Sequence, residues 1–362
     1  MKFSRRAQWN APINQLTNRL TIARQSRRDL LDLTNSNPTR ANIEYPTEEL
    51  AEIMSRAARA SYDPQPLGLV SAREAVAEHV RCSVDDVVIT ASTSEAYSFL
   101  FKLLTDPGDA IATATPSYPL LDHLAQLEQI ELKTFPMEFH RRWEIDVARI
   151  PRDVRALVIV NPNNPTGSYA TVDVDLPTIS DEVFIDYPLA LTQEGRTPSS
   201  ARAGEGARPS EFVLGGLSKS CGLPHYKLGW IITKDREAIH ALELIADNFL
   251  SVSTPVQVAL PELLRLKINE KIQSRIEASY AALKNALADK PHAQLLPVEA
   301  GWSAVVRIPS TMTDEEFALD AIEQHGVVVH PGYFFDFDRD GYFVVSLLTE
   351  PEKLAEGITR IV

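Results

Sequence analysis

The chain of 362 residues has a formal net charge of −13, and 44% of its residues are hydrophobic. This length suits two domains, or one large domain with an appendage, and the hydrophobic content is ordinary for a globular protein. The acidic balance argues against a nucleic-acid-binding protein, because phosphate backbones are bound by an excess of Lys and Arg. Two cysteines, Cys82 and Cys221, are too few for a disulfide framework or a four-thiolate zinc site, and we expect no metal site.

The N-terminal stretch MKFSRRAQWNAPINQL is positively charged but is not followed by an apolar run, so we do not expect a secretory signal. No window approaches the roughly 18 uninterrupted apolar residues of a membrane span. A cytoplasmic enzyme or binding protein, without a membrane partner, is therefore the first expectation.

Residues 1–45 are polar and interrupted by prolines, which indicates an arm with one helix near 13–28. Apolar residues at helical spacing predict two further helices, at about 48–61 and 70–81. From there on, short β-rich runs alternate with helices. The expected strands are 85–91, 109–114, 155–161, 179–186, 211–217 and 228–234, and the expected helices are 94–104, 120–128 and 235–250. Apolar strands alternating with helices imply an α/β fold with a mostly parallel sheet covered on both faces.

The last third of the chain predicts a smaller α/β layer. A break at SVSTP (251–255) precedes one long helix at about 261–289. Strands are then expected within 302–309, 326–332 and 342–348, with helices at 313–325 and 351–360. We therefore expect an arm (1–45) that joins the small domain, a large domain (46–250) and a small C-terminal domain (251–362).

One spacing in the large domain is unusual. Only 13 residues lie between Gly167 and Asp181, and the second strand uses several of them. A crossover between parallel strands normally needs a dozen or more residues and usually contains a helix. The crossover helix here must be very short or absent.

Three motifs lie in or directly after predicted strands, and each allows two interpretations. VIVNPNNPTG (158–167) is either a sharp turn or a rigid support for an Asn amide at the carboxyl edge of the sheet. DEVFIDY (181–187) offers a carboxylate that either caps a helix or faces the protonated ring nitrogen of a cofactor. STSEA (92–96) is either a plain helix N-cap or a phosphate seat.

The fourth motif is GGLSKSCGLPHYKLGW (215–230), in which Lys219 and Lys227 lie among Gly, Ser, Leu, Pro and Trp with no acidic residue. Taken together and in this order, the motifs resemble those of the class I/II aminotransferases, which are fold-type I pyridoxal-phosphate enzymes. The resemblance runs from YDPQPLG through TASTSEA, TPSYPLL, VNPNNPTG and SDEVFIDY to VVVHPG, and it covers nearly the whole chain.

The resemblance implies a large doubly wound, mostly parallel sheet domain that binds pyridoxal 5′-phosphate, and a smaller α/β domain. It implies that Lys219 forms the Schiff base with the cofactor aldehyde and acts as the general base. Asp181 would keep the ring nitrogen protonated, Asn164 would hydrogen-bond the ring hydroxyl oxygen, and Tyr118 would stack on the ring. Cys221, close to Lys219, is interpreted as filler rather than a second catalyst.

The resemblance also assigns the cofactor phosphate. Ser218, Thr93 and Ser94 would form its seat, and Lys227 stands where the family usually has an arginine. A lysine supplies the charge but not the bidentate fork of an arginine. Tyr62 matches a tyrosine that reaches the phosphate from the other subunit, which implies a homodimer.

Two residues depart from the family pattern. Phe184 stands where a tyrosine usually donates to the ring oxygen, a change expected to alter the Schiff-base pKa. Val344 stands where an arginine usually binds the substrate α-carboxylate. Arg40 and Asn37, in the segment NSNPTR, are candidate substitutes, although Arg40 could equally be a solvated arm residue. Arg307, on a strand of the small domain, is a weaker candidate.

The leading hypothesis is therefore a homodimeric aminotransferase that moves an amino group between an amino acid and a 2-oxo acid. The missing arginine keeps a second hypothesis open, a decarboxylase or β-lyase on the same scaffold, because the carboxylate clamp selects which Cα bond reacts. A non-catalytic ligand-binding homologue is a third hypothesis, against which Lys219, Asp181 and Asn164 together argue. The amino donor, the acceptor and the pathway are left open by the sequence.

Overall fold

The computed structural model describes residues 1, 3–4, 6, 13–26, 29–189, 210–250 and 252–362. Residues 27–28 of the predicted first helix and residue 251 of the predicted break lie outside the described residues. Among the described residues, no helix combines the length and apolar character needed to cross a membrane.

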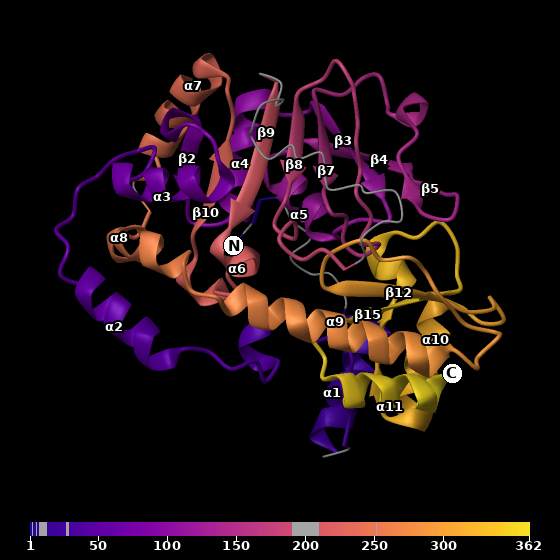
Figure 1. The fold of residues 1–362 in the computed structure, drawn as a ribbon. Helices are drawn as coiled ribbons and strands as arrows, with labels where there is room; N and C mark the ends of the chain where they lie inside the picture. Colours follow the sequence, from indigo (N-terminus) through magenta and orange to yellow (C-terminus); the bar gives the residue numbers. More distant parts are fainter. Residues whose placement is uncertain (2, 5, 7–12, 27–28, 190–209, 251) are drawn as a thin grey trace.

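A seven-stranded sheet forms the larger layer, in the order β2-β10-β9-β8-β7-β3-β4 (Figure 1). Neighbouring strands pair parallel except β10, which is antiparallel to both of its neighbours. The strands are Val87–Thr90 (β2), Ala110–Thr115 (β3), Glu131–Pro136 (β4), Ala156–Val160 (β7), Thr178–Asp181 (β8), Glu211–Gly216 (β9) and Gly229–Ile232 (β10). The mostly parallel sheet of the sequence analysis is confirmed.

Helices cover both faces of this sheet because alternate strand residues point to opposite sides. Val213 and Trp230 pack in one apolar cluster, and Leu214 and Ile231 pack in another. The first cluster includes residues of α3 (Val70–Val80) and α8 (Thr254–Leu263). The second includes residues of α4 (Thr93–Leu104), α5 (Leu120–Leu127) and α7 (Arg236–Asp247). Since both faces are buried, the inner strands β7 (ALVIV) and β10 (GWII) are apolar, whereas the central β8 (TISD) buries Thr178, Ser180 and Asp181.

The smaller layer is an antiparallel four-stranded sheet in the order β11-β12-β15-β14. Its elements are Gln294–Leu295 (β11), Ser303–Arg307 (β12), His330–Pro331 (β14), Tyr342–Ser346 (β15), α9 (Ile268–Leu287), α10 (Asp314–His325) and α11 (Pro351–Ile361). The N-terminal arm lies against this layer. Its helix α1 (Gln15–Gln25) packs on α10, and β1 (Leu31–Asp32) pairs with β13 (Val327–Val328).

The prediction of one long helix at 261–289 was wrong. The structure has two helices, α8 and α9, separated by Leu264–Lys267. Pro261, taken as a helix start, lies inside α8, which packs against α2 (Thr47–Ala57) and α3. The chain turns because α9 packs on α11 instead, and in Figure 1 α9 runs from beside α6 to the small sheet.

Smaller differences have physical reasons as well. The edge strand β4 escaped prediction because its sequence ELKTFP is largely exposed and lacks an apolar run. The strand predicted at 179–186 ends at Asp181, because Val183 and Phe184 are buried in a turn rather than in the sheet. The helix predicted from residue 94 begins at Thr93, and Ser92 is its N-cap. Short strands Glu138–Phe139 (β5) and Trp143–Glu144 (β6) form a separate hairpin.

The expectation of a missing crossover helix is confirmed, since residues 161–177 between β7 and β8 contain no helix. This crossover loop is instead bonded to the segment that precedes β12. The amides of Glu299 and Ala300 both donate to the Gly167 carbonyl oxygen, at 3.0 and 2.9 Å. The Gly301 amide donates to the Tyr187 carbonyl oxygen at 2.9 Å, so residues 299–301 join loops on both sides of β8.

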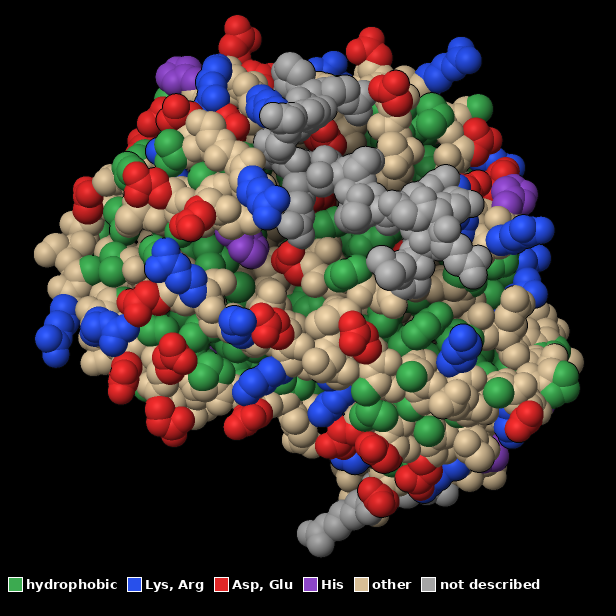
Figure 2. Space-filling model, viewed as in Figure 1, with side chains coloured by type: hydrophobic (Ala, Val, Ile, Leu, Met, Phe, Trp, Pro, Cys, Tyr) green, Lys and Arg blue, Asp and Glu red, His purple; other side chains and the backbone are tan. Residues whose placement is uncertain are grey.

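Charged side chains of both signs are interspersed over the face drawn in Figure 2, where acidic and basic groups often lie side by side. Such a mixed surface contrasts with the basic stripe that a nucleic-acid-binding face presents.

Gly167 provides a test of the joint between the crossover loop and residues 299–301. Its φ is +67°, and an added Cβ would lie 2.5 Å from Val298 Cγ1 and 2.6 Å from the Ala300 carbonyl oxygen. Gly108 is a matched control, because its φ is +95° but no atom lies within 4 Å of an added Cβ. We expect Gly108→Ala to cost only the left-handed backbone strain, about 1–2 kcal/mol.

Gly167→Ala should cost that strain and an overpacking term of about 1–3 kcal/mol. Urea denaturation of the two variants would measure the difference. Equal losses of stability would show that the contact between Gly167 and residues 298–300 is not close-packed in solution.

Candidate active site

The candidate site lies where the strands of the large sheet end. Tyr118 follows β3, Asn164 follows β7, Asp181 ends β8 and Lys219 follows β9. These strands are parallel, so their carboxyl ends share one edge of the sheet. Strands β3 and β7 are neighbours in the sheet. After β3 the chain continues to β4, and after β7 it continues to β8 on the other side of the pair, so the strand order changes direction here. A crevice forms at such a switch point, and ligands of open α/β sheets bind there.

A cavity with an empty volume of about 830 Å³, its open mouth included, occupies this edge. Its described lining residues are Ser36, Thr93, Tyr118, Val160, Asn164, Asp181, Val183, Phe184, Gly216, Ser218, Lys219, Leu228, Trp302 and Ser303. The cavity thus brings together six residues singled out from the sequence: Lys219, Asp181, Asn164, Tyr118, Thr93 and Ser218.

The Lys219 amine is buried beside two aromatic rings. Its Nζ lies 4.7 Å from the ring centre of Trp302 and 5.6 Å from that of Phe184. Burial lowers the pKa of Lys219 to about 8, against a smaller opposing effect of the Asp181 charge. Removal of the ammonium from water disfavours its charged form. The amine is therefore available in its neutral, nucleophilic form near physiological pH.

Lys219 lies in a single helical turn, α6 (Leu217–Ser220), whose backbone is hydrogen-bonded to Tyr187. The Tyr187 hydroxyl donates to the Lys219 carbonyl oxygen at 2.5 Å, and its ring packs edge-on to Trp302. Tyr45 similarly donates to the Gly222 carbonyl oxygen at 2.6 Å. Because Tyr187 is fully buried, this support holds the turn in one position.

Asp181 is buried at the base of the cavity and accepts two hydrogen bonds. The Tyr97 hydroxyl donates to Oδ2 at 2.9 Å, and the Val183 amide donates to Oδ1 at 3.2 Å. Burial raises the pKa of Asp181, whereas these two hydrogen bonds and the charge of Lys219 lower it. Tyr97 comes from α4, so a helix of the sheet's outer layer fixes the carboxylate.

Asn164 is oriented by the small sheet. The Ser303 hydroxyl donates to Asn164 Oδ1 at 3.1 Å. Phe184, in contrast, contributes only its ring to this part of the cavity and packs edge-on to Trp302, with ring centres 5.4 Å apart.

The N-terminal end of α4 meets the cavity at Thr93, with Ser218 nearby in the lining. The Ser92 hydroxyl caps this helix by accepting from the Glu95 amide at 3.2 Å. The first amides of a helix lack intrahelical partners and attract anions. Close approach of β10 to this turn requires Gly229, where a Cβ would lie 2.8 Å from Ser92 carbon. This end of the cavity is suited to a phosphate.

The other residues singled out from the sequence lie outside the cavity lining of the single chain. Ser94 is half-buried in the first turn of α4, and Lys227 is exposed with a left-handed backbone, at a φ of 52°. Tyr62 is 63% exposed. Asn37 accepts from the Thr39 amide and hydroxyl, as the cap of its own turn.

Arg40 is exposed at the end of the turn that Asn37 caps. Ser36 is the residue of this segment that reaches the cavity. Arg307 is directed elsewhere, since it donates to Gln294 Oε1. Val344 is 1% exposed and belongs to an apolar cluster with Phe335.

Burial raises the pKa of the Cys221 thiol to about 12, so this group stays protonated near neutral pH. That environment agrees with the interpretation of Cys221 as filler rather than nucleophile.

The sequence analysis missed Tyr97, Tyr187, Trp302, Ser303 and Ser36. Tyr97 and Tyr187 look like ordinary core aromatics, and only the fold shows where their hydroxyls end. Ser303 starts β12 of the other sheet and Trp302 directly precedes it, 83 residues or more beyond Lys219. The GWS sequence before an apolar run was the one available signal, and it does not specify which site it faces.

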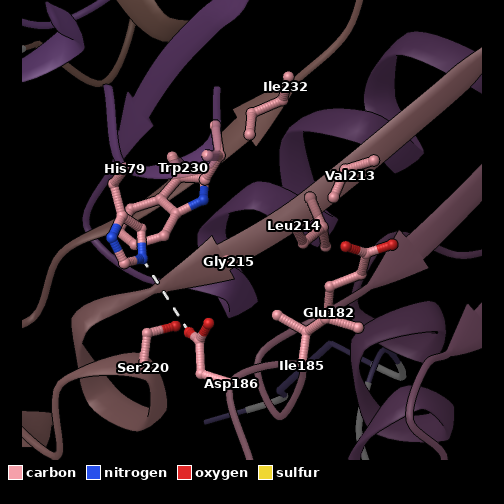
Figure 3. A pocket seen from close by; sticks show the side chains of 11 residues that line it. His79, Glu182, Ile185, Asp186, Val213, Leu214, Gly215, Ser220, Trp230 and Ile232 are labelled. Atoms are coloured by element: carbon pink, nitrogen blue, oxygen red, sulfur yellow. Dashed lines mark ion pairs between the residues drawn. The ribbon is translucent and has the colours of Figure 1, made fainter. Parts of the chain in front are cut away.

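A second, smaller hollow lies between the large sheet and α3, with an empty volume of about 360 Å³ (Figure 3). His79 and Asp186 face each other across it, with Nε2 and Oδ2 4.0 Å apart, and Ser220 lies beside them. Gly215 leaves room there for the Trp230 indole, since a Cβ would lie 2.4 Å from its Nε1. This hollow backs the turn that carries Lys219 but does not contain its amine.

Comparison with known proteins supports the assignment that the site suggests. The family described as "Aminotransferase class I and II" matches residues 28–361. Nicotianamine aminotransferase A of Hordeum vulgare is 26% identical, over 82% of this chain and 71% of that protein. LL-diaminopimelate aminotransferase of Dehalococcoides mccartyi is 25% identical, over 100% and 98%, and tyrosine aminotransferase of Mus musculus is 25% identical, over 99% and 88%.

Solved structures show the same fold. An alanine aminotransferase from Pyrococcus furiosus superposes with a TM-score of 0.85 at 22% identity, covering 99% of this chain and 98% of that one. A double mutant of Thermus thermophilus aspartate aminotransferase gives 0.86 at 21% identity, with 100% of both chains covered. Fold and site thus define an α/β enzyme of the fold-type I architecture. The chain belongs to the class I and II aminotransferase family, whose members use pyridoxal phosphate, and it is a transaminase.

The hydrogen bond from Tyr97 to Asp181 predicts a loss of stability in Tyr97→Phe. A hydrogen bond to a charged group contributes about 1.5–3 kcal/mol, and the variant leaves a buried carboxylate with one donor fewer. Tyr118→Phe is the control, because it removes the same hydroxyl from a ring that is 37% exposed. Urea denaturation of the cofactor-free proteins at pH 7 would measure both effects.

The deficit should depend on pH in a defined direction. Loss of the donor raises the pKa of Asp181 further, so the deficit is full where the carboxylate is ionised. It should shrink as pH falls and Asp181 becomes protonated in both proteins. A deficit independent of pH, or equal to that of Tyr118→Phe, would contradict this role of Tyr97.

Proposed function

We propose that this transaminase binds pyridoxal 5′-phosphate in the cavity at the sheet edge and moves an amino group between an amino acid and a 2-oxo acid. The observation that carries the proposal is the meeting of a half-buried, largely desolvated amine, Lys219, and a buried carboxylate, Asp181, in one cavity. Their opposite charges and separate environments suit two separate roles.

The residues present fit the cofactor. One cavity contains an amine with a lowered pKa, a buried carboxylate, aromatic side chains in its lining and the N-terminal end of a helix. Pyridoxal phosphate, when bound, supplies an aldehyde for an amino group and a ring that accepts electrons from Cα. We assign Lys219 to the aldehyde, Asp181 to the ring nitrogen, Asn164 to the ring oxygen and Tyr118 to the ring face.

For the phosphate we assign Thr93, Ser94, Ser218 and Lys227, together with Tyr62 from the other subunit of a homodimer. The position of Thr93 and Ser218 in the cavity lining supports the first part of this assignment. The exposure of Tyr62 in the single chain supports the second, because a residue that completes another subunit's site must be available on the surface.

Lys219 also suits the role of proton carrier. A lysine at its ordinary pKa near 10.5 is almost entirely charged at neutral pH, whereas a pKa of about 8 leaves about a tenth of the amine neutral at pH 7. General bases work best when their pKa lies near the working pH. The rings of Trp302 and Phe184, which lie 4.7 and 5.6 Å from the amine, contribute to the desolvation that lowers its pKa.

We propose Arg40 as the group that holds the substrate α-carboxylate, with Asn37 keeping its turn in place. Val344 cannot do so, because its side chain is apolar and packed in the core. Ser36, four residues before Arg40, already lines the cavity, and the guanidinium is long and suited to bidentate carboxylate binding.

We further propose a cytoplasmic location and the domain division 1–45, 46–250 and 251–362, with the large domain binding pyridoxal phosphate. The contacts of α1 with α10 and of β1 with β13 support an arm that joins the small domain. Helix α8, although within 251–362, packs with α2 and α3 of the large layer.

The test of the function follows the visible absorption of the cofactor-bound protein while single amino acids are added. A substrate should convert the band while its amino group stays on the cofactor, and a 2-oxo acid should restore it. Release of carbon dioxide, or of free ammonium, would instead favour the decarboxylase or β-lyase hypothesis. Borohydride should attach the cofactor to the peptide that contains Lys219.

Lys219→Ala should reduce turnover by roughly 10²–10⁴-fold and abolish the borohydride label. Lys271→Ala is the matched control, because Lys271 is an exposed lysine that pairs with Glu44. Label on another lysine in the wild-type protein would contradict the assignment.

Arg40→Ala should raise the apparent KM for amino acids by roughly 10- to 100-fold while cofactor binding stays intact, since a hydrogen-bonded charged partner contributes about 1.5–3 kcal/mol. Arg152→Ala is the control, because Arg152 is exposed and precedes β7, at the opposite edge of the sheet. Steady-state kinetics with equal cofactor occupancy would measure both. An unchanged KM in Arg40→Ala would assign the carboxylate to another group.

A further inference from the structure

The hydrogen bond between Ser303 and Asn164 joins residues that are 139 positions apart in the chain. Ser303 lies at the first position of β12 in the small sheet, and Asn164 lies in the loop after β7 of the large sheet. Both side chains line the cavity. We propose that Ser303 is a positioning residue, which orients the Asn164 amide so that Nδ2 donates to the ring oxygen of the cofactor.

The chemistry of the amide explains the effect. An asparagine side chain has one oxygen that accepts and one NH₂ group that donates. Ser303 donates to Oδ1, so Nδ2 is the group that Asn164 offers to a ligand in the cavity. The flipped amide would place its oxygen against an anionic ring oxygen and would leave the Ser303 hydroxyl without this acceptor. Because the hydroxyl could also accept from Nδ2, the anionic ring oxygen selects the amide orientation, and the bond from Ser303 holds the amide in that orientation.

Phe184 makes this orientation matter more in this chain. Its ring lines the cavity and packs against Trp302, the residue directly before Ser303. A phenylalanine has no hydroxyl to donate, so it cannot share the stabilisation of a negative ring oxygen. The charge on that oxygen then depends on the amide of Asn164 and on the residue that orients it.

The backbone holds the two partners in register. Asn164 is three residues from Gly167, whose carbonyl oxygen accepts from the amides of Glu299 and Ala300. Gly301 donates to the Tyr187 carbonyl oxygen. These bonds lie just before Ser303 in the chain and therefore fix its distance from the crossover loop. The ionisable groups among the described lining residues are Lys219, Asp181 and Tyr118, and all remain present in the variants below.

This inference rests on the proposed function, and the experiment separates the two. The visible band of the cofactor-bound protein is titrated with pH. A donor at the ring oxygen stabilises the form that has lost its proton, so loss of the donor raises the pH midpoint. From the usual strength of one hydrogen bond, Ser303→Ala should raise the midpoint by roughly 0.4 to 1 pH unit.

Three further proteins make the test specific. Ser303→Thr keeps the hydroxyl and should keep the wild-type midpoint. Asn164→Ala should raise the midpoint at least as far as Ser303→Ala. The double variant should match Asn164→Ala, because a residue that acts only through Asn164 has no effect once the amide is gone.

Each result of these pH titrations leads to a different conclusion about Ser303. Additive shifts in the double variant would show that Ser303 contacts the cofactor by itself and would overturn the inference, as would an unshifted midpoint in Ser303→Ala. In both cases a normal band in the wild type leaves the proposed function standing. A wild-type protein that binds no pyridoxal phosphate overturns the proposed function and this inference with it.

Discussion

The removal of the Lys219 amine from water is the constraint on which the rest of the site depends. Its pKa falls from the ordinary 10.5 to about 8, which corresponds to a cost of about 3 kcal/mol for holding the charged form in the folded protein. Because the unfolded chain binds this proton more tightly, the contribution of Lys219 to stability increases as pH rises from about 8 to 10.5. At lower pH the charged amine destabilises the folded protein. The same burial keeps part of the amine neutral, as a nucleophile must be.

Several elements keep that amine buried, and they come from both sheets. Trp302 and Phe184 supply aromatic faces that interact with the charged form without hydrating it. Tyr187 holds the backbone of Lys219 from below and packs against the same Trp302. The crossover loop between β7 and β8, which lacks a helix, is bonded to residues 299–301 just before that tryptophan. Trp302 and Ser303, where the chain enters the small sheet, therefore form part of the wall of the site.

The same arrangement explains the chemistry of Asp181 and Asn164. Each has one partner that no local motif predicts, namely Tyr97 from an outer helix and Ser303 from the other sheet. Such partners fix the orientation of groups that must face one ligand from different sides, which is what precise positioning of a reacting group requires.

The sequence was sufficient to predict the residues that follow the strands of the large sheet. The resemblance of the motifs to those of the class I/II aminotransferases named Lys219, Asp181, Asn164, Tyr118, Thr93 and Ser218, and the structure places them in one cavity. The strands beside these motifs could be predicted because strand period and turn residues are local signals. The alternation of apolar strands and helices likewise predicted the α/β sheet and its two covered faces.

The predictions that were wrong or missing concern elements whose position depends on tertiary packing. The single helix at 261–289 became α8 and α9 because the two parts pack against different layers. Strand β4 lacks an apolar run because it lies at the sheet edge. Trp302 and Ser303 could not be assigned to the site, since their position depends on long-range hydrogen bonds to Gly167 and Tyr187 that have no sequence signature.

The lowered pKa of the Lys219 amine, which leaves about half of it neutral at pH 8, can be measured without the cofactor. Cyanate reacts only with unprotonated amines, so its rate of attachment to Lys219, followed by mass spectrometry across a pH series, reports the neutral fraction. The exposed Lys271 in the same protein serves as the internal reference for reagent and conditions. We expect a midpoint for Lys219 at about pH 8. A midpoint near 10.5, the ordinary value for lysine, would contradict it.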